Sequence, residues 1–123
     1  MELRKTELYD AFGEFLYAIA MVDGEVQEAE VKKIEELLTN HEGGEEIQWS
    51  FKYEKQKGKS VEEAFKKAID ICKYYGPSPD YPFLIETVRK VAEASNGLDA
   101  QEKELIARLE KEITEFYDID REE

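Results

Sequence analysis

The spacing of apolar residues near the start of the chain limits its fold more than any other feature. Apolar side chains recur at steps of four, three, four and three residues, at Leu8, Phe12, Phe15, Ile19 and Val22. An α-helix has about 3.6 residues per turn, so this spacing puts all of these side chains on one side of a helix. A β-strand needs apolar and polar residues to alternate, and no segment of strand length does so convincingly. The sequence therefore predicts an all-α fold.

Later segments of the chain have the same helical spacing, and residues that stop helices separate them. The breaks fall at Gly43-Gly44, Gly58, Gly76-Pro77 and Asn96-Gly97. We therefore expect a compact bundle of about six helices. The inward-facing residues after the first helix are predicted to be Val31, Ile34 and Leu38, then Ile47 and Phe51, then Val61, Phe65, Ala68, Cys72 and Tyr75, then Leu84, Val88, Val91 and Ser95, and finally Leu105, Leu109, Ile113 and Phe116.

Two of these helices have recognisable start signals. Ser60 and Glu63 have the spacing of a capping box, in which each side chain accepts a hydrogen bond from the backbone amide of the other residue. Asp99 and Glu102 have the same spacing before the last segment. At the end of the fourth helix, Gly76 is expected to adopt the left-handed conformation that closes many helices.

The composition indicates a single domain over residues 1–123. Hydrophobic residues make up 41% of the chain, enough to form a core, and the charged residues, 38%, must then cover the outside. The longest apolar run, residues 15–22, is far shorter than the ~20 residues that cross a bilayer. We see no signal-peptide pattern and expect a cytoplasmic protein. Cys72 is the only cysteine, which excludes an internal disulfide and a paired-cysteine metal site.

The charge of the chain restricts its partners. With 30 acidic and 17 basic residues, the formal net charge is −13, and such a surface repels nucleic acids and anionic membranes. Residues 52–59 are a local exception, because four lysines there (Lys52, Lys55, Lys57 and Lys59) face a single acid, Glu54. This segment is either a solvated basic turn between helices or a contact for an acidic partner or an anion.

Two helix-turn-helix corners look alike. The first reads Ala-Met-Val-Asp-Gly-Glu-Val over residues 20–26, and the second reads Ala-Ser-Asn-Gly-Leu-Asp over residues 94–99. Each has an Asp or Asn followed by Gly, then one aliphatic residue and a Glu near the start of the next helix. The Gly suits a positive φ, and the aliphatic residue, Val26 or Leu98, anchors the turn in the core. We predict two helical hairpins related by an approximate two-fold axis.

The first corner also matches the second half of an EF-hand calcium loop, but the first half is missing. If Asp23 and Gly24 were positions five and six of such a loop, Glu30 would be position twelve. Positions one and three would then be Ile19 and Met21, whose side chains carry no oxygen ligand. The sequence therefore does not encode an EF-hand.

The two corners, at Asp23-Gly24 and Asn96-Gly97, lie 73 positions apart. Their residues, together with the helical pattern, are similar to those of the tellurite-resistance TerB-like family over most of the chain. The resemblance implies a compact helical bundle with acidic residues near the corners. It further implies binding of a divalent cation, a role in stress or tellurite resistance, and binding of a protein partner.

The same resemblance implies the residues of a metal site. The acidic corner positions of the family fall on Asp23, Glu30 and Glu102, and Asn96 stands where the family has an Asp. Such a site would hold Ca²⁺ or Mg²⁺, which bind carboxylate oxygens. Turn and helix-start roles for these residues are the alternative, since Asp and Asn suit turns and acids are favoured at helix N-termini.

No motif for catalysis stands out. His41 is the only histidine and lies in a predicted loop, Cys72 lies on an apolar stripe, and no phosphate loop or Ser-His-Asp set occurs. Trp49 and Tyr53 are expected to close the bundle, with a groove for a partner as the alternative. We therefore interpret the chain as a non-enzymatic acidic module that binds a protein, with neither nucleic acid nor membrane as partner. The alternative is a metal-dependent enzyme whose site is built from carboxylates.

Overall fold

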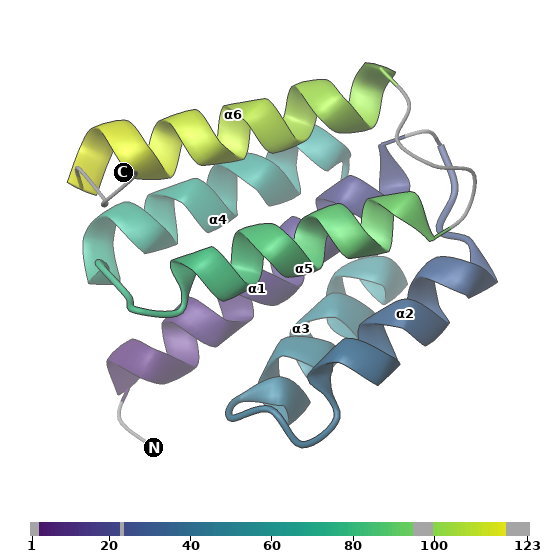
Figure 1. Cartoon of the computed structure of the whole chain (residues 1–123), viewed down its shortest axis with the longest axis horizontal. Helices are drawn as coiled ribbons and strands as arrows, with labels where there is room; N and C mark the ends of the chain where they lie inside the picture. The colour runs from purple at the N-terminus through teal and green to yellow at the C-terminus, as the bar shows by residue number, and fades with distance from the viewer. Residues whose placement is uncertain (1–2, 23, 95–99, 118–123) are drawn as a thin grey trace.

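The computed structural model describes residues 3–22, 24–94 and 100–117, and these ranges form six helices and no strand (Figure 1). The prediction of an all-α bundle of about six helices is therefore confirmed. The helices are α1 (Leu3–Met21), α2 (Glu28–Leu38), α3 (Gly44–Lys57), α4 (Val61–Tyr75), α5 (Tyr81–Glu93) and α6 (Ala100–Tyr117).

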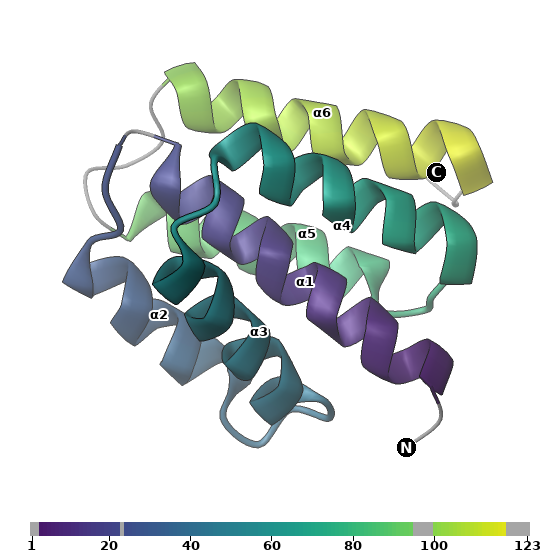
Figure 2. The ribbon, with the colours of Figure 1, turned by 180° about the vertical axis from the view of Figure 1, so that it is seen from behind.

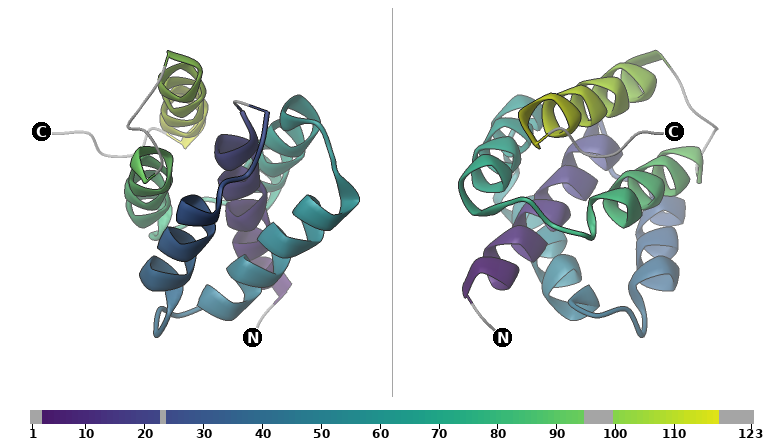
Figure 3. Two further views of the ribbon diagram at one scale, coloured as in Figure 1. Left: turned by 90° about the vertical axis from the view of Figure 1, so that its right-hand side faces the viewer. Right: turned by 60° about the vertical axis from the view of Figure 1, so that its left-hand side comes forward.

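Helix α1 lies at the centre of the bundle. It packs mainly against α3 and α4 and also contacts α5 and α6, whereas α2 packs against α3 and α5. Figure 3 shows α1 between α5 on one side and α3 and α4 on the other. Helix α6 lies along α4, far from α3 (Figure 1).

The single apolar stripe predicted for α1 understates its burial. All of residues 11–20 are buried, including Gly13 and Glu14, so the middle of the helix is covered on every side. The apolar run over residues 15–22 reflects the central place of α1 in the bundle, because a helix with apolar residues on all sides is a buried helix.

The predicted core is otherwise largely confirmed. The stripes of α2 to α6 supply buried residues at the expected positions, although Val31, Val61 and Tyr75 are only partly buried. Ser95 lies outside the described residues, and the side chain of Phe116 is not described. The buried residues predicted from the later stripes are Ile34, Leu38, Ile47, Phe51, Phe65, Ala68, Cys72, Leu84, Val88, Val91, Leu105, Leu109 and Ile113.

The capping box at the start of α4 forms as predicted, but the end of α4 differs. The Glu63 amide donates to Ser60 Oγ over 3.1 Å, and the Ser60 amide donates to a Glu63 carboxylate oxygen over 3.2 Å. Gly76 has φ −75° and ψ −176°, so the prediction of a left-handed glycine there is wrong. The extended backbone leads directly into Pro77, which is consistent with the restriction that proline places on the preceding residue.

Helices α1 and α3 approach each other closely at Gly13. A Cβ atom at Gly13 would lie 2.5 Å from the carbonyl oxygen of Ile47 and 2.8 Å from the amide nitrogen of Phe51. Nearby, Ser50 Oγ donates a hydrogen bond of 2.7 Å to the carbonyl oxygen of Asp10. These contacts fix which side of α3 faces α1, and therefore which side faces away from the bundle.

The predicted two-fold relation of the corners stays a prediction, since Asp23 and Asn96 lie outside the described residues. No helix within the described ranges is long and apolar enough to cross a bilayer.

Candidate functional site

The predicted metal site is only partly described. Asp23 and Asn96 fall outside the described residues, while Glu30 in α2 and Glu102 in α6 are both buried. Glu30 accepts a hydrogen bond of 2.8 Å from the backbone amide of Gln27, so its carboxylate caps the start of α2. Among the described residues, no three His, Cys, Asp or Glu side chains form a group that could hold a metal ion. The cap favours a helix-start role for Glu30, and the metal site remains a prediction.

Two other glutamates lie buried between α1, α3 and α4. Glu14 of α1 and Glu54 of α3 are 2% and 1% exposed. Lys67 of α4 reaches both of them, with its Nζ 3.1 Å from Glu14 Oε2 and 3.6 Å from Glu54 Oε2. Lys59 Nζ lies 3.7 Å from Glu54 Oε1. These two acids and two lysines form a neutral set, which we call the carboxylate–lysine cluster.

Burial and charge shift the pKa values in this region in opposite directions. Burial raises the pKa of Glu14 to about 7, although its hydrogen bond and charge interaction with Lys67 oppose the rise. Burial alone would lower the pKa of Lys67, but the hydrogen bond and charge of Glu14 raise it overall. One turn before Glu14, burial and the neighbouring Glu46 raise the pKa of Asp10 to about 8. The positive charge of the lysines therefore offsets only part of the rise that burial causes in the carboxylate pKa values.

The cluster has a structural character. It joins α1, α3 and α4, and the Tyr17 hydroxyl adds a hydrogen bond of 2.5 Å to the carbonyl oxygen of Lys59. Buried acids that are paired with lysines are not poised to bind a metal ion, because the lysines already supply the positive charge.

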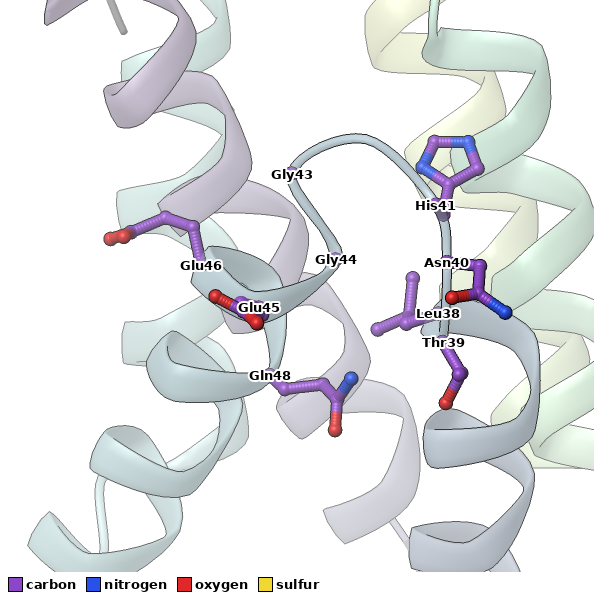
Figure 4. Close-up of a pocket in the computed structure, with 9 residues that line it drawn as sticks. All are labelled: Leu38, Thr39, Asn40, His41, Gly43, Gly44, Glu45, Glu46 and Gln48. Atoms are coloured by element: carbon purple, nitrogen blue, oxygen red, sulfur yellow. The ribbon is translucent and has the colours of Figure 1, made fainter.

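The loop between α2 and α3 borders an open pocket of about 520 Å³ (Figure 4). Its side chains do not converge on one point: Glu46 points away from the segment with Leu38 and His41, while Gln48 points toward it. The His41 ring stacks on Phe83 of α5 with centroids 3.7 Å apart, and its Nδ1 lies 2.8 Å from the carbonyl oxygen of Glu42. This histidine therefore holds the loop against α5.

The outer face of α3 carries two large aromatic side chains. Trp49 is 57% exposed and Tyr53 is 38% exposed, so the expectation that they close the bundle is wrong. Their rings stack with centroids 5.3 Å apart and planes 16° apart, and Lys57 Nζ lies 5.5 Å from the Tyr53 ring centroid. Trp49, Tyr53 and Lys57 follow one another at intervals of four positions, so they lie on the same side of the helix. In Figure 2, α3 lies toward the viewer beside α1.

Charged residues of both signs lie near this aromatic pair, since Glu45 and Glu46 precede Trp49 by four and three positions and lysines follow it. Lys52, Lys55 and Lys57 are exposed, whereas Glu54, the acid of the same segment, is buried in the carboxylate–lysine cluster. We define the α3 face as Trp49, Lys52, Tyr53, Gln56 and Lys57, which share the outer side of the helix by their spacing.

Comparison of the chain with family models, with curated proteins and with solved structures gives no match. The TerB-like resemblance therefore rests on the two corners and the helical pattern of the sequence.

Proposed function

We propose that this chain is a non-enzymatic module that binds a protein partner through the α3 face. The stacked, exposed pair of Trp49 and Tyr53 is the observation that carries the proposal. Tryptophan and tyrosine are the residues on which protein interfaces most often depend, because burying them removes a large apolar area from water.

The fold itself makes little use of these two rings. Helix α3 is held to α1 through Ile47, Phe51, Ser50 and the close approach at Gly13. Trp49 and Tyr53 lie on the opposite side of α3, where their rings stack on each other. A pair that is already ordered before binding loses little side-chain entropy when a partner covers it.

The arrangement of the buried acids supports a binding module over a metal-dependent enzyme. Glu14 and Glu54 are the described carboxylates that share a counter-ion inside the bundle, and Lys67 lies between them. A catalytic metal needs carboxylates that are free to coordinate it and an open position for substrate. Divalent-cation binding at Asp23, Glu30, Asn96 and Glu102, and a role in stress or tellurite resistance, belong to the proposal through the resemblance of the corners.

Selection of binding peptides from a random display library tests the proposal. The whole chain would be compared with a variant that carries Trp49→Ala and Tyr53→Ala, and with Tyr74→Ala as the control, since Tyr74 on α4 is 81% exposed. We expect peptides that bind the wild type and the control, and that bind the double variant at least ~10-fold more weakly. Substitutions at such exposed sites change stability by only ~0.5 kcal/mol, so loss of folding would not imitate this result. Enriched peptides that ignore the double substitution, or no enrichment at all, would reject the proposal.

A further inference from the structure

We infer that the segment bound by the α3 face is acidic and carries an apolar side chain for the aromatic pair. The inference rests on the proposed function and adds the chemistry of the partner. It follows from the charge on the C-terminal half of α3, residues 52–57, where every exposed charge is a lysine although the whole molecule is acidic, whereas Glu45 and Glu46 lie one turn before Trp49.

The lysines of the α3 face are available to an incoming anion. Lys52 of the α3 face and the neighbouring Lys55 form no ion pair with any residue that the structure describes, and Lys57 contacts the Tyr53 ring. Elsewhere on the molecule, Lys33 and Lys90 pair with acids on their own helices, at 3.2 Å in each case.

The burial of Glu54 leaves the C-terminal half of α3, residues 52–57, with only positive exposed charge. It is the one acid within residues 52–59, and its two carboxylate oxygens face Lys59 and Lys67 inside the bundle. All exposed charge on this segment is therefore positive. Lys52 follows Trp49 by three positions and Lys57 follows Tyr53 by four, so the spacing puts each lysine beside a ring.

The same features decide between classes of partner. A chain of net charge −13 repels a long polyanion such as a nucleic acid over most of its surface. A short acidic segment needs only the local positive potential of residues 52–57. The aromatic pair adds a requirement for an aliphatic or aromatic side chain in that segment, since stacked rings gain from burial against apolar groups.

Fluorescence of the full chain tests this directly, because Trp49 is the only tryptophan. The probes are three synthetic peptides of one length with the same leucine and phenylalanine positions, in which the remaining positions are glutamate, glutamine or lysine. A fourth probe is an oligothymidine. Each is titrated into the protein at low and at physiological salt, with polarisation of the labelled probe as a second measurement.

We expect the glutamate peptide alone to bind with a clear change in Trp49 emission. Its affinity should fall severalfold as salt rises, since charges exposed to solvent are screened over about 8 Å at physiological ionic strength. The variant Lys52→Glu with Lys57→Glu should weaken binding by roughly 10-fold or more. The matched control, Lys103→Glu with Lys111→Glu on the distant α6, makes the same change in net charge and should leave binding unchanged.

Equal binding of the glutamate and glutamine peptides, or equal loss in the two charge variants, would overturn the acidic partner while leaving the α3 face as a binding site. Preference for the oligothymidine would also overturn it. If no probe binds, the inference fails, and the display selection decides separately whether the proposed function fails as well.

Discussion

At the scale of single residues, Glu14 and Glu54 occupy positions where an apolar side chain would be expected. Glu54 follows Ile47 and Phe51 on the inward stripe of α3, and Glu14 lies within the buried middle of α1. The apolar stripes of the sequence indicate that these two acids are paired, because a charged residue on a buried stripe needs a partner. They do not identify the partner, since Lys67 is 53 positions from Glu14 and meets it only in the folded chain.

The raised pKa of Glu14 makes stability depend on pH. Its pKa rises from an ordinary 4.5 to about 7 in the folded protein, so between these values the folded state binds more protons than the unfolded state. The free energy of unfolding should therefore be highest at low pH in this window and fall as pH rises through about 7, by on the order of 1 to 3 kcal/mol. Asp10, with a pKa of about 8, contributes in the same direction.

Urea unfolding of the wild type and Glu14→Gln from pH 5 to pH 8 measures this dependence. The variant should show a shallower decline. Glu62→Gln is the control, because the hydrogen bond from Arg108 lowers the pKa of Glu62 and removes it from this window. A Glu14→Gln protein that declines as steeply as the wild type would contradict the assignment.

Cys72 gives a second residue-scale prediction. The thiol is 2% exposed, as its position on the apolar stripe of α4 predicts, and burial raises its pKa to about 12. The native protein should react with a disulfide reagent at pH 8 orders of magnitude more slowly than the urea-unfolded protein, since the thiolate is the reactive form. Comparable rates in the two states would place the thiol at the surface.

At the scale of helices, the spacing of apolar residues predicts each helix. The predictions that fail concern what surrounds a helix in the folded bundle. The stripe of α1 does not reveal burial on all sides, because periodicity reports only the strongest face. Trp49 and Tyr53 have the size of core residues, but the inward side of α3 is already filled by Ile47 and Phe51. Which side of a short amphipathic helix meets solvent depends on α1, and this packing is not encoded within the segment itself.

The contact between α1 and α3 predicts the effect of Gly13→Ala. Inside a helix, replacing glycine by alanine usually stabilises a protein by roughly 0.5 to 1 kcal/mol. Here the new methyl group would collide with the α3 backbone, so we expect the opposite sign and a loss of about 1 to 3 kcal/mol in chemical denaturation. A neutral or stabilising substitution would show that the two helices lie further apart.

At the scale of the whole molecule, the net charge of −13 attracts cations to no particular place. A specific site at the predicted corners differs from this diffuse attraction, because it should survive moderate salt. At a 100-fold excess over its dissociation constant, a bound cation adds ~2.7 kcal/mol to stability. Thermal unfolding with and without Ca²⁺ or Mg²⁺ at physiological salt should show this gain.

Two substitutions separate the corner site from the general charge. Asp23→Ala should abolish the gain in stability, whereas Glu122→Ala removes the same charge from the C-terminal segment and should retain it. Equal metal responses of the wild type and both variants would leave Asp23 as a turn residue. Glu30 would then serve only as the cap of α2.

The exposed aromatic pair beside the lysines of α3, on an acidic molecule, is the centre of the account. Selective quenching of Trp49 fluorescence in the native, unbound protein measures it most directly. We predict ready quenching by acrylamide, because the indole is 57% exposed, and a ratio of iodide to caesium quenching at low salt that depends on the lysines after Trp49 and not only on the net charge of −13 or on Glu45 and Glu46 before it. The variant Lys52→Glu with Lys57→Glu should lower that ratio severalfold, whereas Lys103→Glu with Lys111→Glu, which makes the same change in net charge, should leave it nearly unchanged. A Trp49 shielded from acrylamide, or an equal fall of the ratio in the two charge variants, would contradict the account.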